Sequence, residues 1–253
     1  MDIPRLHAQV EETCMNAWPA RKEIFYDGWL IRLANGQTRR TNSVNVIGRS
    51  ARALGEKIAY CEEIYRAHGQ PSFFRVLSTG PKDLDHALAE RGYAKEDETC
   101  TLYMNFRRHR APGLERHIAL DVQEKRPSPE WLDAHRRLSR RSPAEAQALH
   151  AVLDNLAIPA IFGEARDEEG EIASVAFGAL HERMLCLQWV VTEPGQRRQG
   201  YSRATLSALL NRGREMGATG ACLQVVAANL PAIRLYESLG FVCELYRYHY
   251  RVR

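Results

Sequence analysis

Apolar residues in the first hundred positions follow two spacings, one typical of strands and one typical of helices. In "DGWLIRLA" (27–34) apolar and polar side chains alternate, and "TNSVNVI" (41–47) follows after an Asn-Gly pair that favours a hairpin turn. Residues 53–69 repeat apolar side chains at helical spacing and stop at Gly69. The pattern predicts, in order, a helix (about 6–17), the hairpin, a helix (53–69), a strand (73–78), a short helix (84–92) and a strand (98–104).

The second half of the chain has the same mixture after a charged, proline-containing stretch. Ser128 and Pro129 are typical of a helix start. We therefore divide the chain into an N-terminal module (1–106), a linker (107–127) and a C-terminal domain (128–253). The domain is expected to contain helices near 128–140 and 143–155, three strands within 160–192, and then helix (202–216), strand (221–226), helix (231–239) and strand (241–251).

The order of elements in the first third resembles the order in the last third. "LDHALAERGY" (84–93) and "AIRLYESLGF" (232–241) have the same length and the same final glycine-aromatic step. We interpret this as a degenerate internal duplication. The fold expected is α/β of the α+β type, with a mixed, mostly antiparallel sheet flanked by helices and a second, smaller copy in front.

Composition excludes several classes of protein. The 253 residues carry a formal net charge of +4, too mild for a dedicated nucleic-acid binder, and the basic stretch 105–117 lacks a recognition motif. No apolar run approaches a membrane span, and the N-terminus lacks a signal-peptide pattern. The six cysteines are scattered without metal-ligand spacing. We expect a cytoplasmic protein without a metal, without a nucleic-acid or membrane partner, and either monomeric or homodimeric.

The stretch "QRRQGYSRATLSALL" (196–210) indicates an anion site. An amphipathic helix with Leu206, Leu209 and Leu210 on one face follows a loop rich in arginine, and Ser202 is placed to cap it. Free amides at a helix N-terminus attract anions, and Gly200 allows a ligand to approach the backbone closely. A basic first turn opposes the helix dipole unless an anion binds there.

Two motifs resemble the core of the Gcn5-related N-acetyltransferases. The family's pyrophosphate signature, [RQ]-x-x-G-x-[GA], reads "RRQGYS" (197–202), with serine in the last place. The second signature, N-x-x-A-x-x-x-Y-x-x-x-G-F, fits from Asn229 to Phe241. The resemblance covers 128–253 well, and "DGWLIRLANGQTRRTNSVN" is similar to a module in front of some bacterial members. That module has no such loop, so we expect one active site, in the C-terminal half.

The resemblance implies that acetyl-CoA is the cosubstrate and lies between two splayed parallel strands, 186–192 and 221–226. Tyr236 would be the general acid that protonates the departing thiolate. Asn229 would contact the cofactor arm. The remaining cofactor-binding residues implied are the strand residues Val190 and Val191 and the loop residues Arg197, Arg198, Gln199, Gly200, Tyr201, Ser202 and Arg203.

The general base and the acceptor stay open at this point. Gln188 stands on the strand where many members have a glutamate, and Glu164, His181 and Glu182 are weak candidates for the base. Arg32, Arg39, Arg40 and Asn42 of the hairpin either bind a carboxylate of the acceptor or form a polar solvent face.

The sequence thus predicts an acetyl-CoA-dependent N-acetyltransferase that acts on a primary amine of a small molecule or amino acid. Three alternatives remain: a non-catalytic acyl-CoA-binding or sensing protein, an acetyltransferase for protein N-termini or lysines, and a nucleic-acid binder using 105–117.

Overall fold

One mixed sheet of eleven strands runs through the molecule. The computed structural model describes residues 2–34, 38–108 and 118–253. The strand order is β1-β2-β3-β4-β11-β5-β10-β9-β8-β7-β6. The strands are β1 (Lys22–Tyr26), β2 (Trp29–Leu33), β3 (Val44–Val46), β4 (Phe73–Leu77), β5 (Ala94–Asn105), β6 (Ala119–Glu124), β7 (Ala160–Arg166), β8 (Ile172–His181), β9 (Met184–Thr192), β10 (Gly220–Val226) and β11 (Cys243–Val252).

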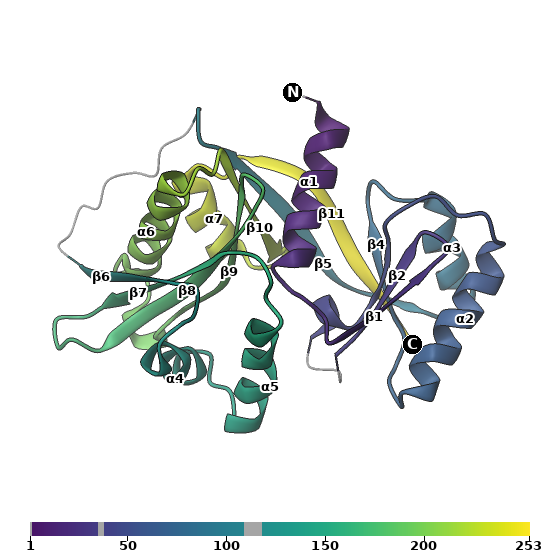
Figure 1. Cartoon of the computed structure of the whole chain (residues 1–253), viewed down its shortest axis with the longest axis horizontal. Helices are drawn as coiled ribbons and strands as arrows, with labels where there is room; N and C mark the ends of the chain where they lie inside the picture. Colours follow the sequence, from purple (N-terminus) through teal and green to yellow (C-terminus); the bar gives the residue numbers. More distant parts are fainter. Residues whose placement is uncertain (1, 35–37, 109–117) are drawn as a thin grey trace.

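Helices cover both faces of this sheet (Figure 1). Serine side chains begin two of them, because Ser128 accepts a hydrogen bond from the Trp131 amide and Ser142 forms a capping box with Glu145. The predicted start at Ser128 is confirmed. The helices are α1 (Ile3–Asn16), α2 (Leu54–Ala67), α3 (Lys82–Glu90), α4 (Pro129–Leu138), α5 (Pro143–Asp154), α6 (Tyr201–Glu215) and α7 (Leu230–Leu239).

The topology confirms the predicted repetition. In the N-terminal unit, β3 and β4 are parallel neighbours connected through α2, and α3 and β5 follow. In the C-terminal unit, β9 and β10 are parallel neighbours connected through α6, and α7 and β11 follow. The same order of strand, helix, parallel strand, helix and final strand therefore occurs twice.

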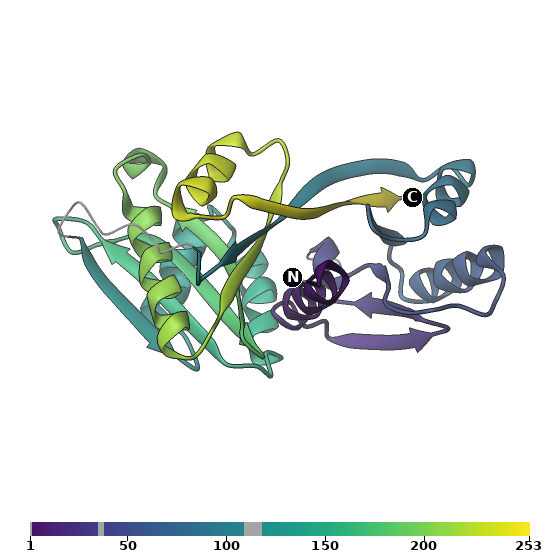
Figure 2. The same cartoon turned by 90° about the horizontal axis from the view of Figure 1, so that it is seen from above.

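The two units exchange their last strands. β11 lies between β4 and β5, and β5 lies between β10 and β11. Figure 2 shows these two long strands spanning the two lobes of the molecule. Each unit is thus completed by a strand from the other end of the chain.

Two parts of the predicted layout need correction, and a third lies outside the described residues. Residues 119–124, placed in the linker, form β6 and pair with β7 along their whole length. β1 was not predicted, and it forms a hairpin with β2 around Asp27 and Gly28, both at positive φ. The predicted Asn35-Gly36 turn lies outside the described residues, and β2 and β3 pair antiparallel on either side of it. The boundaries 1–106, 107–127 and 128–253 otherwise stay a prediction.

Two cores lie on opposite faces of the C-terminal half of the sheet. One face carries Trp131, Phe177 and Cys186 and is covered by α1, α4 and α5. The other carries leucines of α6 and α7, Tyr236 and Phe241. A third core, within the N-terminal unit, lies between its strands and α2 and α3. Since α1 packs on β8, β9 and β10, the start of the chain belongs to the C-terminal core. Among the described helices, none has the length and apolarity that a bilayer crossing requires.

Candidate active site

The strands β9 and β10 separate into a fork. They are paired only at Met184–Gly220, Leu185–Ala221 and Cys186–Cys222. Beyond the last pair, β9 continues to pair with β8 and β10 with β5, so the facing edges of the fork have no strand partner within the described chain. Two carbonyls in this region are occupied, because Arg40 donates to that of Gln224 and the Ser174 hydroxyl donates to that of Val191. Val190 and Val191 lie on β9 beyond the last pair, and their contact with a cosubstrate stays a prediction.

A β-bulge turns β9 away from β10. The β8–β9 register shifts between Val175 and Phe177, and Trp189 has a φ of 54°. A positive φ strains the backbone of an aromatic residue. Such strain and β-bulges are both found often near functional sites. The bulge therefore explains how the fork opens, and periodicity alone did not predict it.

The loop after β9 has an unusual backbone. Arg198 and Gly200 have φ of 64° and 95°, and alternation of ordinary and left-handed residues is typical of loops that bind anions through their amides. Arg197, Arg198, Gln199 and Gly200 are exposed. Within the described residues, no hydrogen-bond acceptor lies within bonding distance of the amides of residues 197–203. The loop thus has the free donors that an anion requires.

Ser202 does not cap α6, contrary to the prediction. Gly200 occupies the N-cap position, with its carbonyl accepting from the Ala204 amide at 2.9 Å. Ser202 lies inside the first turn, where its hydroxyl bonds to Thr192 at the end of β9. Tyr201 is buried, and Arg203 donates to Ser238 of α7 at 3.0 Å. The first turn of α6 is therefore tied to both β9 and α7.

Helix α7 places Asn229 and Tyr236 beside the fork. Asn229 is the N-cap of α7 and its side chain accepts from the Ala232 amide at 3.3 Å, which leaves its amide N–H groups for a ligand. Tyr236 is buried among the residues of the α6–α7 face. Burial raises the pKa of Tyr236 to about 12, against a smaller opposing effect of Arg40. The phenol is therefore protonated throughout the neutral range and can donate a proton.

The chain can now be compared with known proteins. The family model described as "Probable histone acetyltransferase Rv0428c C-terminal" matches residues 8–252. The chain belongs to this family and is a Gcn5-related N-acetyltransferase. Its reaction class is acyl transfer, which confirms the prediction of an acyltransferase. Membership of the family also confirms the predicted fold.

Relatives and solved structures agree with this assignment. The uncharacterized N-acetyltransferase YobR of Bacillus subtilis (strain 168) is 25% identical over 245 residues, covering 97% of this chain and 98% of YobR. The ribosomal protein bS18-alanine N-acetyltransferase of Escherichia coli (strain K12) is 35% identical over 74 residues, 29% of this chain and 50% of that protein.

In fold, the chain resembles a Gcn5-related N-acetyltransferase from Kribbella flavida, with a TM-score of 0.70, 14% identity, and coverage of 99% of this chain and 95% of that one. It also resembles a tandem GNAT protein from the clavulanic acid biosynthesis pathway, with a TM-score of 0.67, 17% identity, and coverage of 83% and 73%.

None of the three base candidates lies at the fork of this acetyltransferase. His181 and Glu182 are at the β8–β9 turn, at the opposite end of β9 from the bulge. Glu164 is buried on β7 and accepts a hydrogen bond from Arg166 at 2.5 Å. Burial raises the pKa of Glu164, with Arg166 opposing the shift. The contacts of Glu164 are therefore structural. The positions of Glu164, His181 and Glu182 agree with the prediction that each is a weak candidate for the base.

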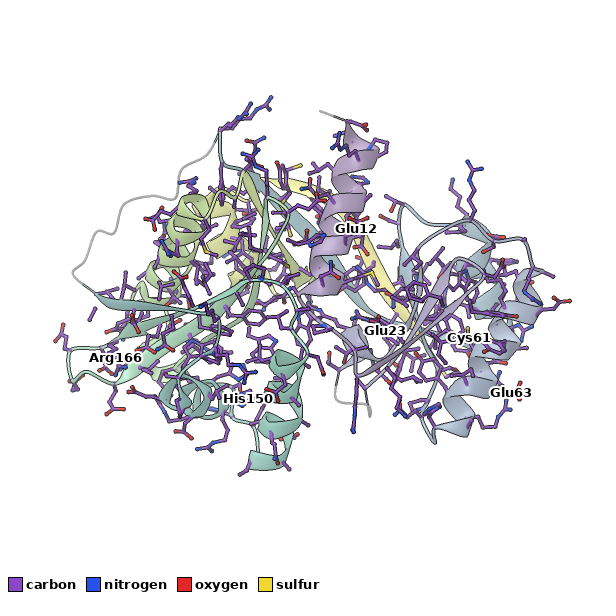
Figure 3. The ribbon with its side chains drawn as sticks, viewed as in Figure 1. Glu12, Glu23, Cys61, Glu63, His150 and Arg166 are labelled. Atoms are coloured by element: carbon purple, nitrogen blue, oxygen red, sulfur yellow. The ribbon has the colours of Figure 1, made fainter. Side chains whose placement is uncertain are left out.

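A pair of histidines that the sequence did not indicate lies against the bulge of the acetyltransferase. His135 Nδ1 is 3.0 Å from His150 Nε2, and the His135 ring stacks on Trp189 at 4.8 Å between centroids. Burial lowers the pKa of His135 to about 3 and also lowers that of His150, so both rings are neutral at pH 7. His150, labelled on α5 in Figure 3, lines a cavity of about 540 Å³ between α4, α5 and β7. Because burial disfavours the protonated form of both rings, the pair is poorly suited to accept a proton at neutral pH.

The hairpin residues of the N-terminal unit have separate roles. Arg32 is buried against Glu23 and backbone carbonyls, and Arg39 pairs with Glu96 and Asp97. Asn42 accepts from the Ala34 amide. Only Arg40, of these four, contacts the fork strands, where it reaches Gln188 and Gln224.

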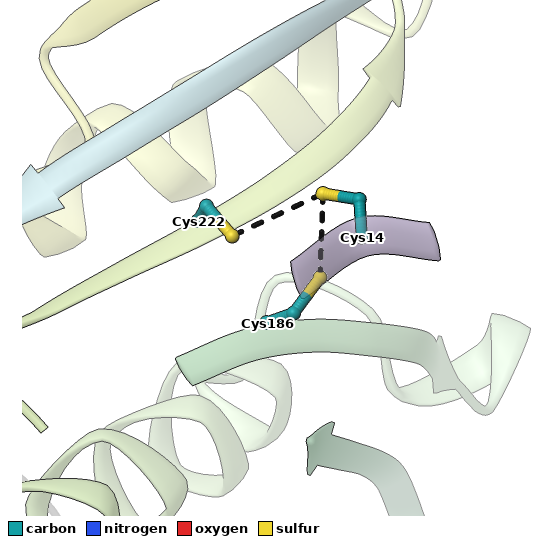
Figure 4. Close-up of side chains that lie close together, drawn as sticks. All are labelled: Cys14, Cys186 and Cys222. Carbon is teal, nitrogen blue, oxygen red and sulfur yellow. Dashed lines mark hydrogen bonds between the residues drawn. The ribbon is translucent and has the colours of Figure 1, made fainter. Parts of the chain in front are cut away.

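Three cysteines meet behind the fork (Figure 4). Cys14 Sγ lies 3.7 Å from Cys186 Sγ and 3.9 Å from Cys222 Sγ, and all three are buried. Their separation in sequence hides this cluster from spacing rules for metal ligands. The distances equal van der Waals contacts of free thiols, which is how small apolar side chains pack.

Proposed function

We propose that the enzyme transfers an acetyl group from acetyl-CoA to the primary amine of a small molecule or amino acid. The observation that carries the proposal is the combination of a strand fork whose facing edges have no strand partner and a helix N-terminus with free amides beside it. Acetyl-CoA has an amide-bearing arm that suits the first and a pyrophosphate that suits the second. It supplies an activated thioester as the acyl donor.

Each predicted cofactor residue has a place in this proposal. Val190 and Val191 offer backbone groups to the arm, and Asn229 offers its side-chain amide from the far side of the fork. The amides of Arg197 to Arg203 hold the pyrophosphate, with the exposed arginines adding charge. Gly200 lets the phosphate approach because its αL backbone carries no Cβ.

Tyr236 is proposed as the general acid. Attack of the amine breaks the carbon–sulfur bond of the thioester, and the departing sulfur takes the proton of the phenol. Because burial raises its pKa to about 12, the phenol keeps its proton in the neutral range and has it available for the departing sulfur.

A calorimetric titration tests the proposal. Acetyl-CoA and coenzyme A should bind, while ATP should bind far more weakly, because it lacks the arm that pairs with the fork. Free-thiol release should then depend on an added amine. Binding without thiol release across amines and peptides would favour the acyl-CoA-sensing alternative, and equal binding of ATP would contradict the assignment of the loop.

A second candidate acceptor is a protein N-terminus or lysine. The family is described as that of a probable histone acetyltransferase and the Escherichia coli relative as a ribosomal-protein acetyltransferase, which favours this acceptor. Incubation with acetyl-CoA and either a peptide library or a panel of free amino acids separates the two. Faster thiol release with peptides at equal amine concentration would favour the protein acceptor.

A further inference from the structure

Arg40 of the N-terminal unit spans the mouth of the fork. Its Nη1 donates to Gln188 Oε1 of β9 at 3.0 Å, and its Nη2 donates to the Gln224 carbonyl of β10 at 3.3 Å. Both glutamines lie two residues beyond the last β9–β10 pair, Cys186–Cys222. The guanidinium is also 5.4 Å from the Trp18 ring centroid. A cation from one structural copy is therefore held between the two strands that form the active site of the other.

Arg40 has no carboxylate partner among the described residues, unlike its neighbours Arg32 and Arg75, and only the phenols of Tyr248 and Tyr250 and the thiol of Cys14 favour its charge. Arg32 is 3.1 Å from Glu23, and Arg75 makes two hydrogen bonds to Glu11, at 2.5 and 2.9 Å. Within the described residues no carboxylate lies within ion-pair distance of Arg40, whose partners are neutral amide oxygens. A largely buried guanidinium normally has a carboxylate partner, because burial removes its hydration.

The polar groups around Arg40 add further unused donors. Trp18 Nε1, Gln224 Nε2 and Tyr250 Oη are buried without a hydrogen-bond partner among the described atoms. Trp18, Gln224 and the three arginines line a small cavity of about 10 Å³. Each of these groups can donate a hydrogen bond. The region thus has an excess of donors and one positive charge, which is the complement of an anion.

Arg40 and the cofactor loop lie on opposite faces of the fork. Side chains alternate along a strand, so Gln188 and Gln224 point the same way as Cys186 and Cys222, toward α1. Tyr236 belongs to the other face, with α6 and α7. If acetyl-CoA occupies the α6–α7 side, the amine must approach the thioester from the side of Arg40.

We propose that Arg40 binds a carboxylate of the acceptor, so that the substrate is an amine that also carries a carboxylate, as an amino acid does. This inference rests on the proposed function. Arg40 is half-buried, and the cavity of about 10 Å³ that it lines would have to widen for a carboxylate to enter. A carboxylate would supply two oxygens to the guanidinium in bidentate geometry and thereby position the amine at the fork.

The test compares acids with their amides as acceptors. Thiol release from acetyl-CoA is measured with the twenty amino acids and, for each active one, with its α-amide. The wild-type enzyme should favour the acid by about 10- to 100-fold in kcat/KM, the range expected for a charge-assisted hydrogen bond. In Arg40→Gln this ratio should fall toward one. Equal rates with acid and amide in the wild type would overturn the inference.

A second variant keeps Arg40 in place. Gln188→Glu is nearly isosteric and puts a carboxylate where Arg40 now has an amide oxygen, as Glu23 does for Arg32. This variant should lower the ratio of kcat/KM for the acid to kcat/KM for the amide, with little change in the Tm. Arg39→Gln is the matched control, since Arg39 pairs with Glu96 and Asp97 and should leave the ratio unchanged.

The outcomes separate this inference from the proposed function. The role of Arg40 alone would be overturned if amines turned over with no preference for the acid. It would also be overturned if neither Arg40→Gln nor Gln188→Glu changed the acid-to-amide ratio of kcat/KM. Absence of acetyl-CoA binding in calorimetry would overturn the proposed function.

Discussion

The two copies of the fold differ most where a strand leads into a helix. Before α6 the loop amides are free and Gly200 opens the backbone. Before α2 the corresponding amides of Ala51 and Arg52 donate to the side chain of Asp27, each at 3.0 Å. Lys57, fully buried, lies 3.4 Å from the same carboxylate. In the N-terminal copy an internal anion thus occupies the place that an external anion takes in our proposal for the C-terminal copy.

The position of the proposed acid differs as well. Aligning residues 84–93 with 232–241 places Leu88 opposite Tyr236, and Gly92 opposite Gly240. Both glycines have positive φ, so the helix ends are built alike. Leu88 is buried in the core of the N-terminal unit. In our proposal a fold is therefore repeated while the chemistry is kept in one copy.

The largest expected effect is on cosubstrate binding. Gly200→Leu forces a side chain onto a backbone with φ of 95° and should displace the loop amides. Losing two charge-assisted hydrogen bonds of about 2 kcal/mol each corresponds to about 1000-fold weaker acetyl-CoA binding by calorimetry. Gly217→Leu, at φ of 92° beyond the other end of α6, is the matched control. Similar loss in both variants would mean that strain, not the loop, sets affinity.

The next effect is on turnover. Tyr236→Phe should lower kcat by about 100-fold or more, since general acid catalysis contributes on that order, while the Kd for acetyl-CoA stays within about twofold. Steady-state thiol release together with calorimetry measures both. Tyr93→Phe, at the place of Phe241 in the N-terminal copy, should leave kcat unchanged. Unchanged kcat in Tyr236→Phe would remove the acid role.

The pH profile sharpens this comparison. Because burial raises the pKa of Tyr236 to about 12, its proton is retained as the solution becomes moderately alkaline. The kcat of the wild type should therefore not decline between about pH 7 and pH 10. A fall of kcat centred within that interval would show either that Tyr236 titrates lower or that another acid is used.

The smallest effect concerns the N-terminal copy. Backbone hydrogen bonds from Ala51 and Arg52 lower the pKa of Asp27. The stability it contributes is present above its unfolded pKa, near about 4, and is lost as the pH falls through its lower folded pKa. Asp27→Ala should lower the Tm at pH 7, and the deficit should shrink on acidification.

Inorganic phosphate should partly restore the Tm of Asp27→Ala by binding to the vacated amides. Asp154→Ala, an exposed aspartate, is the control, and its Tm should not respond. A phosphate response of equal size in both variants would contradict the view that Asp27 occupies an anion site.

The sequence predicted the elements better than their partners. Periodicity identified most helices and strands to within a few residues, and two signatures indicated the loop, Asn229 and Tyr236. It missed β1 and β6, the two edge strands, because neither has a fully buried residue and each is short, so the apolar alternation is weak. It placed Ser202 as a cap because a serine follows the loop, but the backbone turn at Gly200 begins the helix first.

Long-range contacts explain what else the sequence did not indicate. The strand exchange, the cysteine cluster and the contact of Arg40 with Gln224 join positions about 150 to 200 residues apart. Local patterns state which face of an element is apolar but not which distant element covers it.

The exchanged strands also affect the order of events during synthesis. β4 has β11 as its neighbour in the sheet, and β11 is synthesised after every other described strand. Until then β4 has an unpaired edge and β5 lacks one of its partners. The N-terminal copy therefore cannot complete its sheet before residues 243–252 are synthesised, and a nascent chain released before residue 243 should be degraded or aggregate rather than persist as half an enzyme.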